Sequence, residues 1–358
     1  MDDFTSALYL GLHNPADKVQ PWRQLTTGVP AALRERAADR WLAKEVARMQ
    51  GLEKGVIAPS SLHLFWDVMS MLGAKDLVLA DDKVYQIARW GLERAACHGA
   101  KVIYFKHHDA KSLQLQLQRH QPSRSSSVLV VSDGWCPHCG KAAPLPAYLA
   151  AVRKHKGLLL LDDTQAFGVL GKAPSGSMPY GEGGGGLLQW FGLSGPDIIT
   201  ICSLAKGFGV PLAVLSGSAT WLKGFLRQSE TRLHCSPVSA AHVHAAQYAL
   251  AENRRAGAML RQKLLQHVLF FKAAVSRAGF TSRGSFFPVQ TLSRNRAISG
   301  QALYQLLSEN GIRALLLEPH SSQEALVGFC LSAAHTTAQL KRVAECLFHT
   351  KNSVLQTV

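Results

Sequence analysis

The chain has 358 residues, of which 47% are hydrophobic and 18% charged, and its formal net charge is +15 at pH 7. This is the composition of a globular protein, and no apolar run approaches the roughly 20 residues that span a bilayer, so we expect no membrane association. The basic residues are scattered, which argues against nucleic acid and favours smaller anionic partners. The N-terminal residues lack the basic region and long apolar core of a signal peptide, so we expect a cytoplasmic location.

Short apolar runs alternate with helical patterns along most of the chain. Helices are predicted over 31–50, 62–74, 84–98 and 146–156, and buried strands over 101–105, 127–133, 157–163, 197–203 and 212–218. Continuous apolar runs separated by longer connections are typical of a mostly parallel sheet in an α/β fold. A long helical segment over 238–277 and a smaller α+β region follow. We therefore expect an N-terminal segment (1–50), a large domain (51–237) and a bridging helix with a small C-terminal domain (238–358).

Polar residues stand at the carboxyl ends of three predicted strands. They are Ser132-Asp133, Asp162-Asp163 and Ser203. In open α/β sheets the ligand binds beyond these strand ends, so they give the first indication of a site.

The motif Cys136-Pro137-His138-Cys139 is the one CxxC among seven cysteines. It has the spacing of a redox dithiol or of half a zinc site. Pro144 and Pro146 delay any helix after the two cysteines, which argues against a redox dithiol. A zinc site would need two further ligands, and the sequence has no second CxxC, although His107-His108 and His242-x-His244 are available. These observations favour a loop that serves another site, with the redox and metal alternatives open.

Lys206 follows a predicted strand, in a turn of small residues, and Asp162 lies at the end of another strand. Partial burial lowers the pKa of a lysine, so its neutral amine can condense with an aldehyde. An aspartate at a neighbouring strand end can keep a pyridine nitrogen protonated. The alternative is a solvated loop lysine and a helix-capping aspartate, and the chemistry alone does not separate the two.

Five motifs, in this order, carry a resemblance that extends over nearly the whole chain. They are SALYLGL (6–12), VSDGW…CGKAAPL (131–145), LDDTQAFGVLG (161–171), ITICSLAKGFGV (199–210) and CLSAAHT (330–336). With them the sequence resembles the α-oxoamine synthase family, the fold-type-I pyridoxal-phosphate enzymes that include 8-amino-7-oxononanoate synthase and glycine C-acetyltransferase. The resemblance implies the aminotransferase-like α/β fold with a mostly parallel central sheet and a small α+β C-terminal domain, pyridoxal 5'-phosphate as cofactor, and a homodimer.

The resemblance also implies roles for individual residues. Lys206 would form the Schiff base and move protons, and Asp162 would pair with the pyridinium nitrogen. Tyr85 would stack on the ring, and Ser203 would help to hold the phosphate. The remaining implied contacts are Ser60, Ser61 and Leu62 at the phosphate turn, Gln165 at the phenolic oxygen, Ser236 at the partner subunit's phosphate, and Asp133 and His138 near the substrate.

The sequence departs from the family pattern where the amino-acid carboxylate is normally bound. Leu326, Val327 and Gly328 stand where the family has an arginine run, and Glu318 stands at another arginine position. Arg313, Arg294 or Arg296 could substitute. The amino-donor substrate is therefore not expected to be held as glycine or alanine would be.

Three functions remain open. The first is an acyltransferase that condenses an amino-acid carbanion with an acyl thioester of coenzyme A or an acyl carrier protein. The second is an aminotransferase or lyase whose altered pocket is indicated by Glu318 and the missing arginine. The third is a non-catalytic homologue, against which the intact pair of Asp162 and Lys206 argues.

Overall fold

The protein is described here from a computed structural model, which covers residues 1–12, 24–120, 127–293, 298–317 and 325–355. The chain divides into two compact units. The large unit comprises His13–Trp135 and Ala142–Arg255, and the small unit comprises Met1–Leu12, Cys136–Lys141 and Ala256–Val358. The predicted division at residues 50 and 237 stays a prediction.

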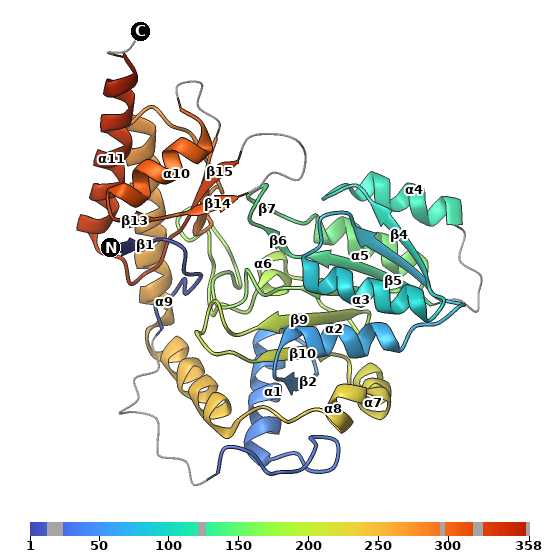
Figure 1. The fold of residues 1–358 in the computed structure, drawn as a ribbon. Helices are drawn as coiled ribbons and strands as arrows, with labels where there is room; N and C mark the ends of the chain where they lie inside the picture. Colours follow the sequence, from blue (N-terminus) through green and yellow to red (C-terminus); the bar gives the residue numbers. More distant parts are fainter. Residues whose placement is uncertain (13–23, 121–126, 294–297, 318–324, 356–358) are drawn as a thin grey trace. The chain divides into compact units, whose positions relative to one another are not determined.

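The large unit is built on a seven-stranded sheet with the strand order β2-β10-β9-β8-β5-β3-β4 (Figure 1). The strands are β2 (Lys54–Ala58), β3 (Leu77–Asp81), β4 (Lys101–Phe105), β5 (Val128–Asp133), β8 (Leu158–Asp162), β9 (Ile198–Ser203) and β10 (Ala213–Gly217). The strands from β9 to β4 are parallel, and β10 is antiparallel to both of its neighbours. The central strands are buried on both faces, which is why their sequences are continuous apolar runs.

Helices of the large unit cover the sheet and complete its core. They are α1 (Ala37–Gln50), α2 (Ser61–Ser70), α3 (Gln86–Cys97), α4 (Ala110–His120), α5 (Leu145–Lys154), α6 (Leu187–Phe191), α7 (Ala219–Gln228) and α8 (Glu230–His234). The helices α2 and α3 lie side by side (Figure 1). Phe65 of α2 and Leu92 of α3 join Val78 and Leu215 of the sheet in one hydrophobic cluster. Burial of these apolar side chains stabilises the sheet and fixes its strand ends in space.

The small unit is an α+β arrangement around an antiparallel sheet of order β11-β12-β15-β14. Its elements are β1 (Asp2–Asp3), α9 (Ala240–Arg277, which enters from the large unit), β11 (Ser282–Arg283), β12 (Val289–Leu292), α10 (Gly300–Glu309), β13 (Ile312–Arg313), β14 (Leu315–Leu317), β15 (Leu326–Cys330) and α11 (Thr337–Leu355). Phe329 packs edge-on against Phe4 and contacts Phe271. The hairpin of β6 (Trp135–Cys136) and β7 (Lys141–Ala142) carries the CxxC motif.

The predicted strands are confirmed to within one residue and most predicted helices to within a few residues, but the helices α4 and α7 and several short elements were not predicted. The strands β2 and β3 were not predicted, although all five residues of β3 are buried. The helix predicted over 31–50 begins at Ala37, and the one predicted over 62–74 ends at Ser70. None of the helices in the described ranges combines the length and apolar character that a bilayer-spanning segment requires.

Candidate functional site

The polar strand ends predicted from the sequence lie together at one edge of the large unit's sheet. Asp133 at the end of β5 is paired in register with Asp162 at the end of β8. Asp162 is also in register with Ile201 of β9, two residues before Ser203. The carboxyl ends of parallel strands are where ligands bind in open α/β sheets, so this edge is the candidate site.

Thr164 connects two of these strand ends and was not singled out from the sequence. Its backbone amide donates to Oδ1 of Asp162 at 2.9 Å, and its Oγ1 accepts from the backbone amide of Ser203 at 3.0 Å. The first contact is an Asx turn, in which an aspartate accepts the amide two residues later. The DDT sequence is the signal that could have identified this turn, and Thr164 orients Asp162 relative to the end of β9.

The Asp162 carboxyl has a strongly perturbed environment. Burial raises its pKa, whereas the hydrogen bonds from Thr164 and the positive charge of Lys206 oppose that rise by favouring the carboxylate. Burial disfavours a charged carboxyl in this way because the low-dielectric surroundings solvate it poorly. A second positive charge at this carboxyl would therefore stabilise its ionised form.

Lys206 lies in the tight turn that follows β9. The amide of Phe208 donates to the carbonyl of Leu204 at 3.1 Å and closes the turn, and the Lys206 side chain is half-buried. The next residue, Gly207, is packed so closely that a Cβ there would lie 2.4 Å from the Phe167 carbonyl oxygen. The glycine after the lysine thus lets the turn pack against the segment that follows β8, and it fixes the base of the Lys206 side chain.

Asp163 is a structural neighbour of the site rather than part of its surface. Its side chain is fully buried, and its carboxylate accepts from the backbone amide of Leu187 at the start of α6. Burial raises the pKa of Asp163 well above its ordinary value, and the charge of Asp162 raises it further. Gly186 makes room for this carboxylate, because a Cβ there would lie 1.8 Å from its Oδ2.

Tyr85 and Asp133 are joined by a hydrogen bond. The backbone amide of Tyr85, the N-cap residue of α3, donates to Oδ2 of Asp133 at 3.0 Å. Asp133 therefore fixes the start of α3, in addition to the substrate contact predicted for it. The Tyr85 side chain is 59% exposed, which leaves its ring face accessible for the predicted stacking contact.

The predicted phosphate turn is the N-terminus of α2. Ser60 is its N-cap residue, but no side chain caps the first-turn amides, and the Ser60 hydroxyl instead lies 2.9 Å from Nδ1 of His63. Ser61 is half-buried and Leu62 is partly exposed. A ten-residue helix whose first amides have no side-chain cap suits an anionic group, because those amides and the helix dipole both favour negative charge.

Gln165 and Ser203, predicted as cofactor contacts, are both half-buried in the large unit. Gln165 follows Thr164 in the turn after β8. The Ser203 hydroxyl accepts from the amide of Ala205 at 3.3 Å and so contributes to the turn that carries Lys206. Both residues therefore belong to the two turns that form the candidate site.

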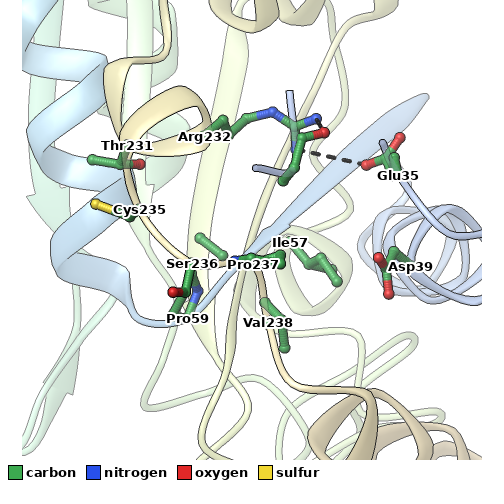
Figure 2. A pocket seen from close by; sticks show the side chains of 12 residues that line it. Glu35, Asp39, Ile57, Pro59, Thr231, Arg232, Cys235, Ser236, Pro237 and Val238 are labelled. Atoms are coloured by element: carbon green, nitrogen blue, oxygen red, sulfur yellow. Dashed lines mark hydrogen bonds and ion pairs between the residues drawn. The ribbon is translucent and has the colours of Figure 1, made fainter. Parts of the chain in front are cut away.

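Ser236 lines a cavity on the large unit, shown in Figure 2. Pro59, the residue before the phosphate turn, lines the same cavity. Across the cavity the Arg232 guanidinium approaches Glu35 at 3.6 Å and donates to the carbonyl of Ala31 at 3.2 Å. The contact of Ser236 with a partner subunit's phosphate stays a prediction.

The remaining predicted substrate residues belong to other parts of the chain. His138 is exposed in the hairpin turn between β6 and β7. Glu318, Arg294 and Arg296 lie outside the described residues. Arg313, the other proposed substitute arginine, is exposed on β13.

The strand β15 carries the residues that replace the family's arginine run. Val327 and Gly328 of this strand are buried, and Leu326 is half-buried. Arg261 of α9, which the sequence did not single out, is an arginine that is only 5% exposed in the small unit, and burial lowers its pKa to about 10.

Comparisons with known proteins agree with the motifs. No family model matches the chain. The 8-amino-7-oxononanoate synthase of Stutzerimonas stutzeri is 29% identical over 283 residues, which cover 78% of this chain and 68% of that protein. The 8-amino-7-oxononanoate synthase of Thioalkalivibrio sulfidiphilus is 28% identical over 318 residues, which cover 87% of this chain and 76% of that protein.

Solved structures share the fold. One described as SPT with PLP internal aldimine has a TM-score of 0.85 at 16% identity, covering 98% of this chain and 87% of that one. The 8-amino-7-oxononanoate synthase of Francisella tularensis has a TM-score of 0.76 at 19% identity, covering 100% of this chain and 99% of that one. By its motifs and its curated relatives, the chain is similar to the α-oxoamine synthase family of fold-type-I pyridoxal-phosphate enzymes, and it shares the fold of these solved structures.

Proposed function

We propose that the protein is a pyridoxal-phosphate-dependent acyltransferase that joins an amino-acid-derived carbanion to an acyl group carried as a thioester of coenzyme A or an acyl carrier protein. The observation that supports this most directly is the placement of Lys206 and Asp162 in adjacent turns at the carboxyl ends of β8 and β9, where the lysine charge acts on the aspartate. The curated relatives carry the name of a synthase in this family.

The residues present fit pyridoxal phosphate. The first amides of α2 lack a side-chain cap and suit a phosphate, and Asp162 is a half-buried carboxyl whose ionised form a cationic ring nitrogen would stabilise. Tyr85 offers an exposed aromatic face. When bound, the cofactor supplies an aldehyde and an electron-withdrawing ring that stabilises negative charge on the substrate carbon.

The chain's own residues have distinct tasks in this proposal. Lys206 would hold the cofactor through its aldehyde, and Nζ of Lys206 would move a proton at the α-carbon of the amino-acid substrate. Asp162, as an ionised carboxylate, would stabilise a proton on the ring nitrogen of the cofactor. Thr164 keeps the Asp162 carboxylate oriented through its amide and hydroxyl. Gln165 is a neutral amide that can donate to the cofactor's phenolic oxygen but does not titrate.

The same proposal includes a homodimer and a cytoplasmic location. The support for the dimer is the family's two-fold assembly, in which the segment around Ser236 reaches the partner subunit's phosphate. The net charge of +15 suits acyl carriers, which are anionic.

The test is free-thiol release from acyl-coenzyme A and acyl carrier protein thioesters with a panel of amino acids. Thiol release that requires the amino acid and disappears in Lys206→Ala supports the acyltransferase. A protein that binds the cofactor and transfers amino groups to 2-oxo acids, with no thioester consumed, supports the second candidate below.

The second candidate is an aminotransferase or lyase with an altered substrate pocket. It is favoured by Leu326, Val327 and Gly328, which stand on β15 where the family has its carboxylate-binding arginine run. Without a guanidinium there, an amino-acid carboxylate loses a bidentate partner. An amine substrate without that carboxylate would need no such partner.

A further inference from the structure

The hairpin turn Cys136-Pro137-His138-Cys139-Gly140 has a compact backbone built around its two sulfur atoms. The backbone amide of Cys139 donates to Sγ of Cys136 at 3.4 Å. The amide of Gly140 donates to the carbonyl of Cys136 at 2.9 Å and closes the turn. The amide of Lys141 donates to the sulfur of Cys139. Each sulfur thus receives a backbone N–H, an arrangement that stabilises negative charge on both.

The turn is also held rigidly in the small unit. Gly140 has a φ of +69°, which favours glycine, and a Cβ at this position would lie 2.6 Å from the backbone nitrogen of Gly284. Pro137 restricts the backbone on the other side of the turn. A chelator whose backbone is already fixed loses little conformational freedom when it binds an ion.

The position of the cysteines does not suit a dithiol oxidoreductase. Such an enzyme places its attacking thiolate at the accessible N-terminus of a helix. Cys136 is instead 6% exposed and lies on strand β6, and the next helix, α5, begins only at Leu145. The buried first sulfur has poor access to an external disulfide, whereas a metal ion can be bound from the side of the more accessible Cys139.

We propose that Cys136 and Cys139 are the thiolate pair of a structural zinc site. Two cysteines separated by two residues, in a turn with amide-to-sulfur hydrogen bonds and a glycine directly after, form the usual half of such a site. Both thiols lose their protons when zinc binds. This inference is independent of the proposed acyl-transfer chemistry, and its test needs no measurement of activity.

Zinc takes four ligands in structural sites, so two further ligands are needed, and imidazole is the usual partner of thiolate. His138 lies within the turn itself, between the two cysteines. The nitrogen ligands are identified by substitution.

The experiment uses the full-length protein with its cofactor bound. Its zinc content is measured by mass spectrometry of the metal, and cobalt(II) is then titrated into chelator-treated protein. The inference predicts one zinc ion per chain, and a cobalt spectrum with a sulfur-to-metal charge-transfer band and the strong visible bands of a tetrahedral site. Cys136→Ser and Cys139→Ser should each remove charge-transfer intensity and weaken zinc binding by more than about 100-fold, the upper end of what an outer-shell change costs.

Cys97→Ser is the matched control, because Cys97 is an exposed thiol at the end of α3 and its loss should leave the cobalt spectrum unchanged. Histidine-to-alanine substitutions, beginning with His138 of the turn itself, identify the nitrogen ligands by the same titration. The inference is overturned if wild-type protein shows no thiolate-to-cobalt band, or if mass mapping finds a Cys136–Cys139 disulfide in protein purified without reductant. The wild-type spectrum requires no substitution, so misfolding of a variant leaves the test intact.

Discussion

Replacing Thr164 with valine removes one hydroxyl from the candidate site and keeps the shape of the side chain. The hydroxyl oxygen accepts the amide of Ser203 at 3.0 Å and also hydrogen-bonds to Asp162. A half-buried amide without a partner costs about 1–2 kcal/mol, and a hydrogen bond to a charged group contributes about 1.5–3 kcal/mol. The two contacts are coupled through one atom, so we expect Thr164→Val to lower the free energy of unfolding by about 2–4 kcal/mol.

The same substitution should weaken cofactor binding. Without the Thr164 hydroxyl the pKa of Asp162 rises further, because burial is then opposed by one hydrogen bond fewer. Protonation of this carboxyl competes with its pairing to a cationic ring nitrogen. A loss of about 1.4–2.8 kcal/mol corresponds to cofactor binding that is about 10-fold to 100-fold weaker.

The assays are guanidinium unfolding of cofactor-free protein and an absorbance titration with pyridoxal phosphate. Thr164→Ser keeps the hydroxyl and is the matched control, and it should retain most of the cofactor affinity. The reasoning is refuted if Thr164→Val binds the cofactor as tightly as wild type, or if the serine variant loses as much affinity as the valine variant.

Two further predictions concern pH and backbone packing. Burial lowers the pKa of His335, whose Nδ1 accepts the amide of Ser332 at 3.1 Å. Around pH 6.5 and below, the unfolded chain therefore binds more protons at this histidine than the folded protein does. Guanidinium unfolding should show the free energy of unfolding falling as the pH is lowered from about 7.5 to about 5.5. The fall should be smaller in His335→Gln. Gly186→Ala would place a Cβ 1.8 Å from Oδ2 of Asp163, whereas Gly192→Ala, at the other end of α6, has nothing within 4 Å. Both glycines have a positive φ, so either alanine strains the backbone, but only the alanine at position 186 also meets the Asp163 carboxylate. Thermal unfolding should show a loss of stability of about 1–2 kcal/mol for Gly192→Ala and of more than about 3 kcal/mol for Gly186→Ala. Equal losses would contradict the packing explanation.

The sequence predicts the strands that carry the site because burial on both faces makes them continuous apolar runs. It does not give the strand order, in which β10 lies between β2 and β9. The antiparallel direction of β10 could have been predicted, because a parallel neighbour needs a connection of about a dozen residues or more and the segment after Ser203 is shorter. The strand β3 could also have been predicted, because all five of its residues are buried and four of them form a continuous apolar run.

The sequence predicts which strand-end residues and motif positions make up the candidate site. It does not predict the hydrogen bonds between them. Asp133 and Asp162 were recognised from their places after buried strands, and the structure pairs them in register. The contact of Thr164 with Ser203 joins residues 39 positions apart, so no local pattern reveals it. The amide-to-sulfur bond within the CxxC turn depends on backbone geometry that the spacing alone leaves open.

The central claim is that the amine of Lys206 binds the aldehyde of pyridoxal phosphate beside Asp162. The direct measurement is borohydride reduction of the protein incubated with pyridoxal phosphate, followed by peptide mass mapping. The account predicts a reduced pyridoxyl phosphate adduct on Lys206, absent in Lys206→Ala and weaker in Asp162→Asn. Protein that remains colourless and carries no adduct on Lys206, or an adduct only on other lysines, would contradict it.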